Sequence, residues 1–302
     1  MTLKTVVAAV DFSAGSAVAL ARAAELAGRA GAALHVLHAD VLFHSSGDGA
    51  PSGAAAGGAL RQRLAQVARE VGATGATLAV VRDVKAVAAI VRYVAEVDAD
   101  LLVLGTHGRT GVARLLMGSV AEACVASAPC PVLTVPEAAE AAPSAKAPVL
   151  VAVDFSDRSR AAVAAGRRLA DLYGADLELV HVVHDAGPYP GLAPNILSLL
   201  DFDPDHGRVV HDRLARFAET VPGAAPAAFH AALGAPSRLV AALAAERGAG
   251  AIVLGTHGRT GLAHALIGSV AEATLRRSPC PVLTLRQPHR LGQVERPLAL
   301  AS

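Results

Sequence analysis

The sequence contains one motif twice, and this repeat limits the folds that the chain can adopt. The first copy is Gly-Thr-His-Gly-Arg-Thr-Gly at 105–111, with Gly-Ser at 118–119, and the second copy repeats both parts at 255–261 and 268–269. A short apolar run, rich in branched residues, precedes each copy and predicts a buried strand. Each Gly-Ser step opens an apolar, Ala-rich segment that predicts a helix. The repeated unit is therefore a strand, a glycine loop and a helix N-terminus.

A glycine loop that leads into a helix N-terminus is typical of an anion-binding site. Glycine allows positive backbone φ angles and close approach of a ligand, and the free N–H groups at a helix start suit a phosphate. The motif is not a P-loop, because no Lys follows Gly118 or Gly268, and neither copy has the Rossmann spacing Gly-x-Gly-x-x-Gly. A tight turn that binds no ligand is the alternative interpretation.

The order of the predicted elements indicates an α/β fold. Strands are predicted in the first half at 5–10, 33–39, 77–81, 101–104 and 131–135, and helices at 16–30, 60–71, 84–97 and 118–127. Strands that alternate with helices predict a parallel sheet covered on both faces, with right-handed crossovers.

The same plan restarts after a Pro- and Ala-rich stretch at 137–148, which predicts a linker. Asp154-Phe155-Ser156 repeats Asp11-Phe12-Ser13, so the length of 302 residues divides into domains at 1–136 and 149–286, with a C-terminal tail at 287–302. Long loops are predicted after the second strand of each half, at 45–59 and 185–207. They are expected to border the ligand.

Two aspartates are expected near the glycine loops. Asp11 and Asp154 follow the first strand of each half, and each loop follows the fourth strand. In a flavodoxin-like strand order, these two strands flank the reversal point at which parallel sheets bind ligands. A carboxylate there can accept hydrogen bonds from a ribose hydroxyl or a base amine. Support of a helix cap beside Ser13 or Ser156 is the alternative role.

The spacing Gly-x2-Gly-x9-Gly-Ser resembles the nucleotide motif of the universal stress protein family, and the resemblance extends over both halves. It implies a tandem member with two flavodoxin/adenine-nucleotide-hydrolase-like domains. Each domain would hold a five-stranded parallel sheet with helices on both faces, and the two would pack as a pseudo-dimer. The last strand commonly pairs two domains in this family, so we expect 132–135 and 282–285 to join the halves and cover each other's edges.

The resemblance also implies ATP as the ligand, with or without Mg²⁺, and a set of contacts in each half. In the first half these are Ala9, Val10, Asp11, Ala39, Leu104, Gly105, His107, Gly108, Gly118, Ser119 and Val120. In the second half they are Ala152, Val153, Asp154, Val182, Leu254, Gly255, His257, Gly258, Gly268, Ser269 and Val270. Arg109 and Arg259 lie inside the loops and are candidate phosphate ligands, with a solvated side chain as the alternative.

Nothing in the sequence demands catalysis. No nucleophile or pair of carboxylates accompanies His107 or His257, so we expect these residues to contact phosphate through their backbone. The histidine spacing implies no metal site. The leading hypothesis is a cytoplasmic ATP-binding regulatory protein of the stress response with an unknown protein partner. A nucleotide-free scaffold and a weak ATPase are the alternatives, and homodimerisation of the whole chain is left open.

Composition excludes several partners. The net charge of +1 offers no basic field for nucleic acid, and no stretch of about 18 apolar residues predicts a membrane span. The N-terminus runs directly into a strand, so no signal peptide is expected. Cys124, Cys130 and Cys280 are expected to be buried hydrophobic residues in a reducing cytoplasm, with a redox role as the alternative.

Overall fold

A computed structural model describes residues 3–42, 54–106, 117–139, 147–183, 203–256 and 267–286. The first half contains β1 (Thr5–Ala9), α1 (Ala14–Ala30), β2 (Ala33–Val41), α2 (Ala54–Glu70), β3 (Thr77–Asp83), α3 (Ala86–Glu96), β4 (Leu101–Gly105), α4 (Ser119–Ser127) and β5 (Val132–Val135). The second half contains β6 (Val149–Ala152), α5 (Asp157–Tyr173), β7 (Leu177–Val183), α7 (Pro204–Glu219), β8 (Ala228–Leu233), α8 (Pro236–Glu246), β9 (Ala251–Gly255), α9 (Ser269–Arg277) and β10 (Val282–Leu285). The alternation of strands and helices predicted from the sequence is confirmed.

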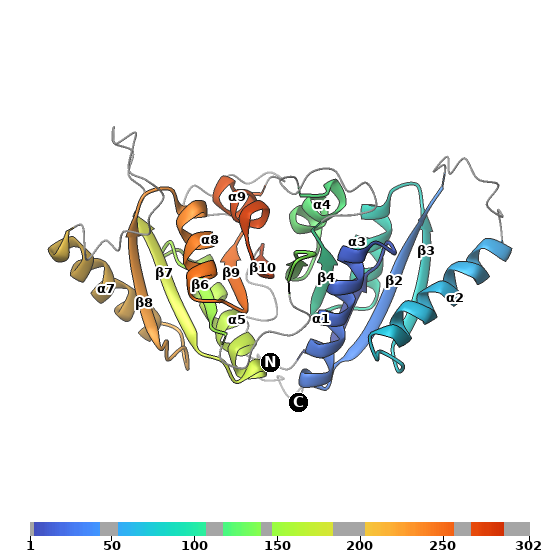
Figure 1. The fold of residues 1–302 in the computed structure, drawn as a ribbon, viewed down its shortest axis with the longest axis horizontal. Helices are drawn as coiled ribbons and strands as arrows, with labels where there is room; N and C mark the ends of the chain where they lie inside the picture. Colours follow the sequence, from blue (N-terminus) through green and yellow to red (C-terminus); the bar gives the residue numbers. More distant parts are fainter. Residues whose placement is uncertain are drawn as a thin grey trace, which may run out of the picture.

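All the described strands form one sheet that crosses both halves. Its order is β3-β2-β1-β4-β5-β10-β9-β6-β7-β8, so each half is a parallel sheet with the order 3-2-1-4-5. The two halves meet where β5 and β10 pair antiparallel at the centre of the molecule (Figure 1). The predicted fold class and the predicted packing through the last strands are both confirmed.

The strands bury side chains on both faces, as expected for a parallel sheet between helices. In β4, Leu101 and Val103 join the core beneath α1, α2, α5 and α7, while Leu102 and Leu104 join the core beneath α3, α4, α8 and α9. Each of these two cores contains residues from both halves. The central strands therefore hold the halves together as one hydrophobic unit.

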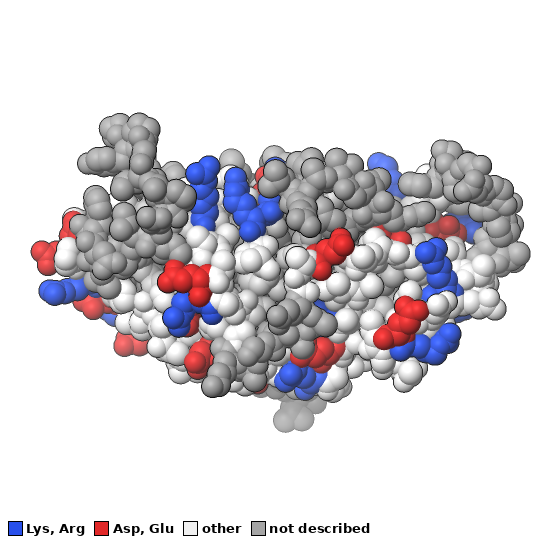
Figure 2. Space-filling model, in the orientation of Figure 1, with Lys and Arg blue, Asp and Glu red and all other residues white. Residues whose placement is uncertain are grey.

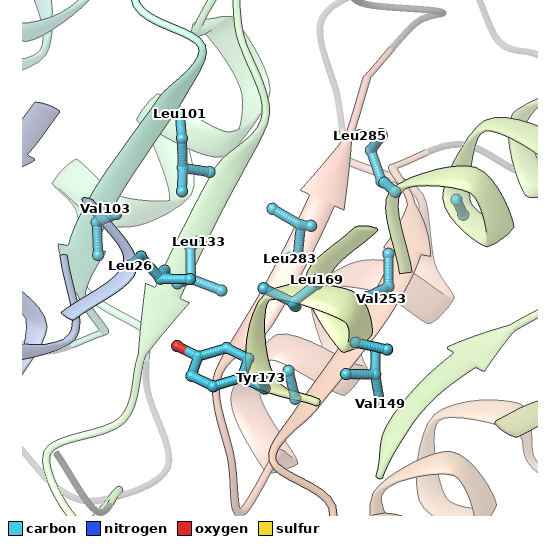
Figure 3. Close-up of a cluster of buried hydrophobic side chains, with 14 of the residues drawn as sticks. Leu26, Leu101, Val103, Leu133, Val149, Leu169, Tyr173, Val253, Leu283 and Leu285 are labelled. Carbon is cyan, nitrogen blue, oxygen red and sulfur yellow. The ribbon is translucent and has the colours of Figure 1, made fainter. Parts of the chain in front are cut away.

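The junction between the halves is built in the same way on its two sides. Thr134 Oγ1 donates a hydrogen bond to the Val282 carbonyl at 3.3 Å, and Thr284 Oγ1 donates to the Val132 carbonyl at 3.1 Å. Leu133 and Leu283 pair between these two threonines in the register. Figure 3 shows them at the junction, with Leu26 of α1 and Leu169 of α5 nearby. The arrangement relates the halves by a pseudo-twofold axis.

The ends of α1 and α5 follow from their sequences. Ser13 and Ser156 cap the N-termini, each accepting a hydrogen bond from a backbone N–H of the first turn. Gly31 and Gly174 end the helices with φ of 64° and 63°, in the left-handed conformation that favours glycine. The predicted cap at Ser13 is confirmed, and Ser156 plays the same part in the second half.

Two predicted loops are shorter than expected. Helix α2 already begins at Ala54 within the loop predicted at 45–59, because its alanines favour a helix strongly enough to include Gly57 and Gly58. Helix α7 begins at Pro204 within the loop predicted at 185–207, where Asp203 caps it and proline occupies its first turn. The remaining loop residues, 45–53 and 185–202, and their predicted role beside the ligand lie outside the described residues.

The three cysteines are buried, as predicted, and their thiols are free. Burial raises the pKa of the Cys124 and Cys130 thiols to about 12 and that of Cys280 to about 11. Because the thiolate is the reactive form, these side chains act as small hydrophobic residues.

The described surface carries basic and acidic side chains interspersed on the face shown in Figure 2. Within the described part of the chain, no helix combines the length and apolar character needed to cross a membrane.

Candidate functional site

The carboxyl edge of each sheet collects the predicted contacts around the reversal of strand order. In the first half, β1 lies between β2 and β4, with Ala9 level with Leu37 on one side and Leu104 on the other. Asp11 follows β1, and Gly105 ends β4 at the same edge. In the second half, β6 lies between β7 and β9 in the same way. The topology therefore opens a crevice at the place where parallel sheets bind ligands.

The two aspartates hold the serine caps of the helices that follow them. Asp11 Oδ1 accepts hydrogen bonds from the Ser13 backbone N–H at 3.0 Å and from Ser13 Oγ at 2.6 Å. Asp154 Oδ1 accepts the equivalent bonds from Ser156 at 3.0 and 2.5 Å. The structural role left open for these carboxylates is thus present in both halves, and their contact with a ligand stays a prediction.

The halves differ in one serine beside the aspartate. Ser159 Oγ donates to Asp154 Oδ1 at 2.5 Å, whereas the equivalent Ser16 Oγ donates to the Ser13 carbonyl at 2.9 Å. This serine therefore bonds the aspartate carboxylate in the second half, whereas in the first half it bonds a backbone carbonyl.

A phenylalanine with unusual backbone geometry lies between each aspartate and serine. Phe12 has φ of 65° and Phe155 has φ of 66°, a left-handed conformation that is strained for an aromatic residue. Each ring lies against the histidine of the second strand, with centroid distances of 4.5 Å to His38 and to His181.

An arginine also lies over each phenylalanine ring. The Cζ atom of Arg63 in α2 lies 4.3 Å from the Phe12 ring centroid, and that of Arg213 in α7 lies 4.0 Å from the Phe155 ring centroid. Both separations are within the range of a cation–π interaction. The same group of histidine, phenylalanine and arginine therefore packs at the turn that carries the aspartate in both halves.

The same two histidines also hydrogen-bond the backbone carbonyl of the residue before each aspartate. His38 Nδ1 lies 2.7 Å from the Val10 carbonyl, and His181 Nδ1 lies 2.6 Å from the Val153 carbonyl. Because a carbonyl only accepts, each Nδ1 carries the proton. The Val10 backbone N–H donates to the Leu37 carbonyl at 2.8 Å, so a ligand contact by Val10 would involve its side chain.

Gly105 has a structural reason to lack a side chain. A Cβ atom there would lie 3.0 Å from the Gly15 carbonyl carbon and oxygen and 3.3 Å from the Ser16 nitrogen. The end of β4 therefore packs directly on the first turn of α1. This contact explains the glycine without a ligand, which the sequence motif did not indicate.

The third glycine of each motif is not needed for a left-handed backbone. Gly118 and Gly268 precede α4 and α9 with φ of −62° and −61°, which any residue can adopt. Of the two general reasons for glycine, positive φ therefore does not apply at these two positions. What glycine contributes is an open helix start, because it places no side chain over the N–H groups of the first turn.

The starts of α4 and α9 also expose an apolar side chain. Val120 is 38% exposed and Val270 is 43% exposed, which is unusual for large hydrophobic residues in this protein. Each follows the serine of its Gly-Ser step. An exposed valine beside uncapped N–H groups offers both apolar and polar contacts to a ligand.

A cavity of about 230 Å³ lies at this edge of the second half. It is lined by every predicted second-half contact that the structure describes: Ala152, Val153, Asp154, Val182, Leu254, Gly255, Gly268, Ser269 and Val270. Its volume is below the roughly 300–1,000 Å³ typical of small-molecule pockets, so the described residues alone form a small crevice. His257, Gly258 and Arg259 lie outside the described residues.

The predicted contacts of the first half occupy the equivalent positions at the other site. They lie at the ends of β1 and β4, in β2 and at the start of α4: Ala9, Val10, Asp11, Ala39, Leu104, Gly105, Gly118, Ser119 and Val120. His107, Gly108 and Arg109 are not among the described residues. The Gly118 N–H donates to the Thr106 carbonyl at 2.7 Å, and the Gly268 N–H donates to the Thr256 carbonyl at 2.7 Å. The start of α4 is therefore hydrogen-bonded to the residue after β4 in the same way as the start of α9 is to the residue after β9.

Several residues that line the second-half cavity were not predicted from the sequence. Arg158, Ser159 and His181 come from α5 and β7, and Pro236 and Val240 come from α8. Arg158 stands where the first half has Gly15, and this difference between the repeats was the available signal. The α8 residues have no motif, and only the fold places them here.

Among the described residues, no group of three or more His, Cys, Asp or Glu side chains is arranged to hold a metal ion.

Comparison with known proteins identifies the family of both halves. The family model described as the universal stress protein family matches residues 2–136 and 147–286. Universal stress protein Rv2005c of Mycobacterium tuberculosis is 34% identical over 196 residues, and universal stress protein Rv1996 of the same organism is 29% identical over 190 residues. The first alignment covers 63% of this chain and 63% of the relative, and the second covers 62% and 59%.

A solved structure has the same fold over most of its length. The universal stress protein from Archaeoglobus fulgidus superimposes with a TM-score of 0.62 and 21% identity, covering 94% of this chain and 96% of that one. Its likeness concerns the fold. Because the family model matches each half in turn, the chain belongs to the universal stress protein family as a tandem, two-domain member.

Proposed function

We propose that the protein binds ATP at the carboxyl edge of each half and acts as a regulatory protein of the stress response. The observation that carries this proposal is the second-half cavity, which brings residues from β6, β7, β9 and α9 into one lining. The motif spacing and the family resemblance predict nine of these lining residues as nucleotide contacts. The equivalent residues of the first half share the same edge of the sheet.

The two ends of a nucleotide would meet different chemistry at this edge. The uncapped N–H groups of α9 and the glycine loop suit the phosphates, with or without Mg²⁺, and the helix dipole favours their charge. Asp154 suits a ribose hydroxyl or base amine as a hydrogen-bond acceptor. Val182 and the exposed Val270 supply apolar contact for the base or ribose. Arg259 is the candidate phosphate ligand of this half, as Arg109 is of the other.

Binding is proposed in preference to catalysis. Asp154, the carboxylate at the cavity, accepts hydrogen bonds from Ser156 and Ser159, an arrangement that positions it as a fixed acceptor. Phosphoryl transfer uses carboxylates that hold a metal or orient the attacking group. A slow ATPase activity is the corresponding alternative, and phosphate release measured against a loop variant would detect it.

A nucleotide-free scaffold is the second candidate, and two observations favour it. Asp11 already serves the cap at Ser13, and Gly105 already serves the packing of β4 on α1. Both residues would therefore be explained by folding alone. The proposal requires that they serve the ligand as well.

Mass spectrometry of freshly purified and then denatured protein separates these candidates. The proposal predicts ATP or a related adenine nucleotide in the released fraction. Equilibrium dialysis with added ATP extends the test to protein that loses nucleotide during purification. Asp154→Asn should weaken binding in the second half, whereas Asp205→Asn, an exposed change in α7, should leave it unaltered. Protein that neither carries nor takes up adenine nucleotide would favour the scaffold.

We further propose a cytoplasmic location and domain boundaries at residues 1–136 and 149–286, with a linker at 137–148 and a tail at 287–302. The pseudo-dimer would present both nucleotide sites to a protein partner from the same side of the molecule, because α4 and α9 lie together on that side (Figure 1). Limited proteolysis that cuts first within 137–148 or 287–302 would agree with these boundaries.

A further inference from the structure

A second cavity lies between α1 and α5, where the two halves meet, and shares no lining residue with the crevice of the second half. Its volume is about 440 Å³, within the roughly 300–1,000 Å³ typical of ligand pockets. Leu3, just before β1, and Leu101, at the start of β4, line it, so it borders the amino ends of the strands. It is therefore a separate site.

The interior of this cavity is apolar and comes from both halves. Leu26 of α1 and Leu169 of α5 are pseudo-symmetric partners, as are Leu133 of β5 and Leu283 of β10, and all four line the cavity. Figure 3 shows these leucines gathered at the junction of the halves. They are buried, whereas Arg29 and Asp171 on the rim are substantially exposed. The cavity thus has a hydrophobic interior and a polar mouth.

A departure from the pseudo-symmetry leaves this space unfilled. Tyr173 ends α5, and its ring projects from α5 toward the first half in Figure 3. Its hydroxyl donates to Glu25 Oε2 at 3.3 Å. The offset of 143 residues between the capping glycines Gly31 and Gly174 makes Ala30 the equivalent of Tyr173. Alanine does not reach across the junction, and Ala30 lines the cavity.

The same departure leaves Arg168 without a partner. By the same offset Arg168 is the equivalent of Glu25. Glu25 meets the Tyr173 hydroxyl, whereas Arg168 lines the cavity together with Ala30, the equivalent of that tyrosine. Its Nε and Nη2 atoms are buried and have no hydrogen-bond partner among the described residues. Burial lowers the pKa of Arg168, although an arginine stays protonated at neutral pH. A buried cationic edge without an acceptor is unfavourable unless something else supplies one.

The neighbouring charged side chains have other partners. Asp171 accepts from Arg167 Nε at 2.9 Å, and Arg29 Nε donates to Glu25 at 2.9 Å. Arg29 Nη1 also donates to the Leu172 carbonyl at 3.3 Å. None of these groups hydrogen-bonds the two buried Arg168 atoms in this structure, so a bound ligand can supply their acceptor.

Nε and Nη2 form the side-on edge of a guanidinium group, whose two parallel N–H bonds match the two oxygens of a carboxylate. We propose that this cavity binds an amphiphilic carboxylic acid of the fatty-acid class, its carboxylate on the Arg168 edge and its chain between the paired leucines. One such molecule would bind per chain, because only one half supplies the arginine to this cavity. Arg168 and Ala30 together define this second site.

Calorimetric titration of the full chain with decanoate, decan-1-ol and acetate tests both parts of the ligand. Decanoate should bind with a stoichiometry of one. Acetate lacks the chain and decanol lacks the charge, so each should bind at least about tenfold more weakly. Decanol that binds as tightly as decanoate, or wild-type protein that binds no decanoate, would overturn the proposal.

Two variants and a control place the ligand. Arg168→Gln should weaken decanoate binding at least about tenfold, whereas Arg167→Gln, a change in the adjacent residue outside the cavity, should not. Ala30→Tyr should fill the space as Tyr173 does on the other side, and so abolish binding with the fold retained by circular dichroism. Unchanged affinity in both Arg168→Gln and Ala30→Tyr would show that decanoate binds elsewhere and would refute the assignment.

Discussion

Leu133 of β5 lies opposite Leu283 of β10 in the antiparallel register that joins the two halves. Because the flanking pairs place Thr134 against Val282 and Val132 against Thr284, the contact is the same viewed from either side. It has the form of a twofold interface between identical subunits, although both partners belong to one chain. Each last strand thereby covers the sheet edge that the other would leave open.

The central pair should contribute strongly to stability. Leu133 is 2% exposed, so Leu133→Ala removes buried apolar contact at the junction and should lower the free energy of unfolding by roughly 2–5 kcal/mol. Val209→Ala in α7, at a position that is 62% exposed, is the control and should change it by less than about 0.5 kcal/mol. Urea denaturation measures both. A loss below about 1 kcal/mol for Leu133→Ala would argue against a shared core.

Phe12 should show an inverted preference between glycine and alanine. Both Phe12→Gly and Phe12→Ala remove the ring and its contact with Arg63, but only alanine keeps a Cβ at φ of 65°. The glycine variant should therefore be the more stable of the two by about 1 kcal/mol. At Ala17, exposed in helix α1, glycine should instead be worse than alanine by about 1 kcal/mol. Thermal unfolding measures this difference. A midpoint temperature for Phe12→Ala that equals or exceeds that for Phe12→Gly would contradict the strained turn.

Glu178 should make the second half sensitive to acid. Burial opposes its ionisation, but hydrogen bonds from Arg247 and His230 outweigh burial and lower its pKa. Because the folded pKa lies below the ordinary value of 4.5, the unfolded chain binds more protons in that range. The stabilisation is complete above pH 4.5 and is lost as the pH falls through the folded pKa.

The variant Glu178→Gln isolates this effect. It should cost about 2 kcal/mol at pH 7, and the gap to wild type should narrow below about pH 4.5. Glu96→Gln, at an exposed position in α3, should show neither change. Urea unfolding at several pH values gives the comparison, and a gap that is constant between pH 7 and pH 3 would be inconsistent with a lowered pKa at Glu178.

The cysteines should be unreactive in the folded protein. With pKa values raised by burial to about 12 for Cys124 and Cys130 and about 11 for Cys280, very little thiolate exists at pH 8. Iodoacetamide at pH 8 should therefore leave native protein unmodified and label all three thiols in denaturant, as mass spectrometry would show. Rapid labelling of native Cys280 would instead restore the redox interpretation.

Much of the fold could be predicted because it depends on local patterns. The apolar run at 101–104 is continuous, as expected for a strand buried on both faces, and the Asp-Phe-Ser turn and Gly-Ser step recur at matching places in each half. The family resemblance, together with the need to cover the sheet edges, then predicted the pairing of the last strands. The sequence predicts that α2 begins at residue 60, later than the observed Ala54, because Gly57 and Gly58 interrupt the helical pattern. The tertiary packing of Leu64 and Ala68 stabilises the whole helix despite these glycines.

Features that depend on tertiary approach could not be predicted. The role of Gly105 requires knowing that β4 meets the first turn of α1, which is distant in the sequence. Pro236 and Val240 reach the cavity from α8 without any motif. The orphaned Arg168 follows from Ala30 standing where Tyr173 stands in the other half, a comparison that has meaning only once the halves are packed together.

Titration of nucleotide-free protein with ATP tests the central proposal most directly. Gly118→Val and Gly268→Val change residues whose backbone angles accept valine, so the fold should survive while a side chain covers each helix start. Calorimetry should give two equivalents of ATP for wild type, one for each single variant and none for the double variant. Absence of binding in the wild type, or variants that still bind two equivalents, would contradict a nucleotide site at the start of α4 and α9.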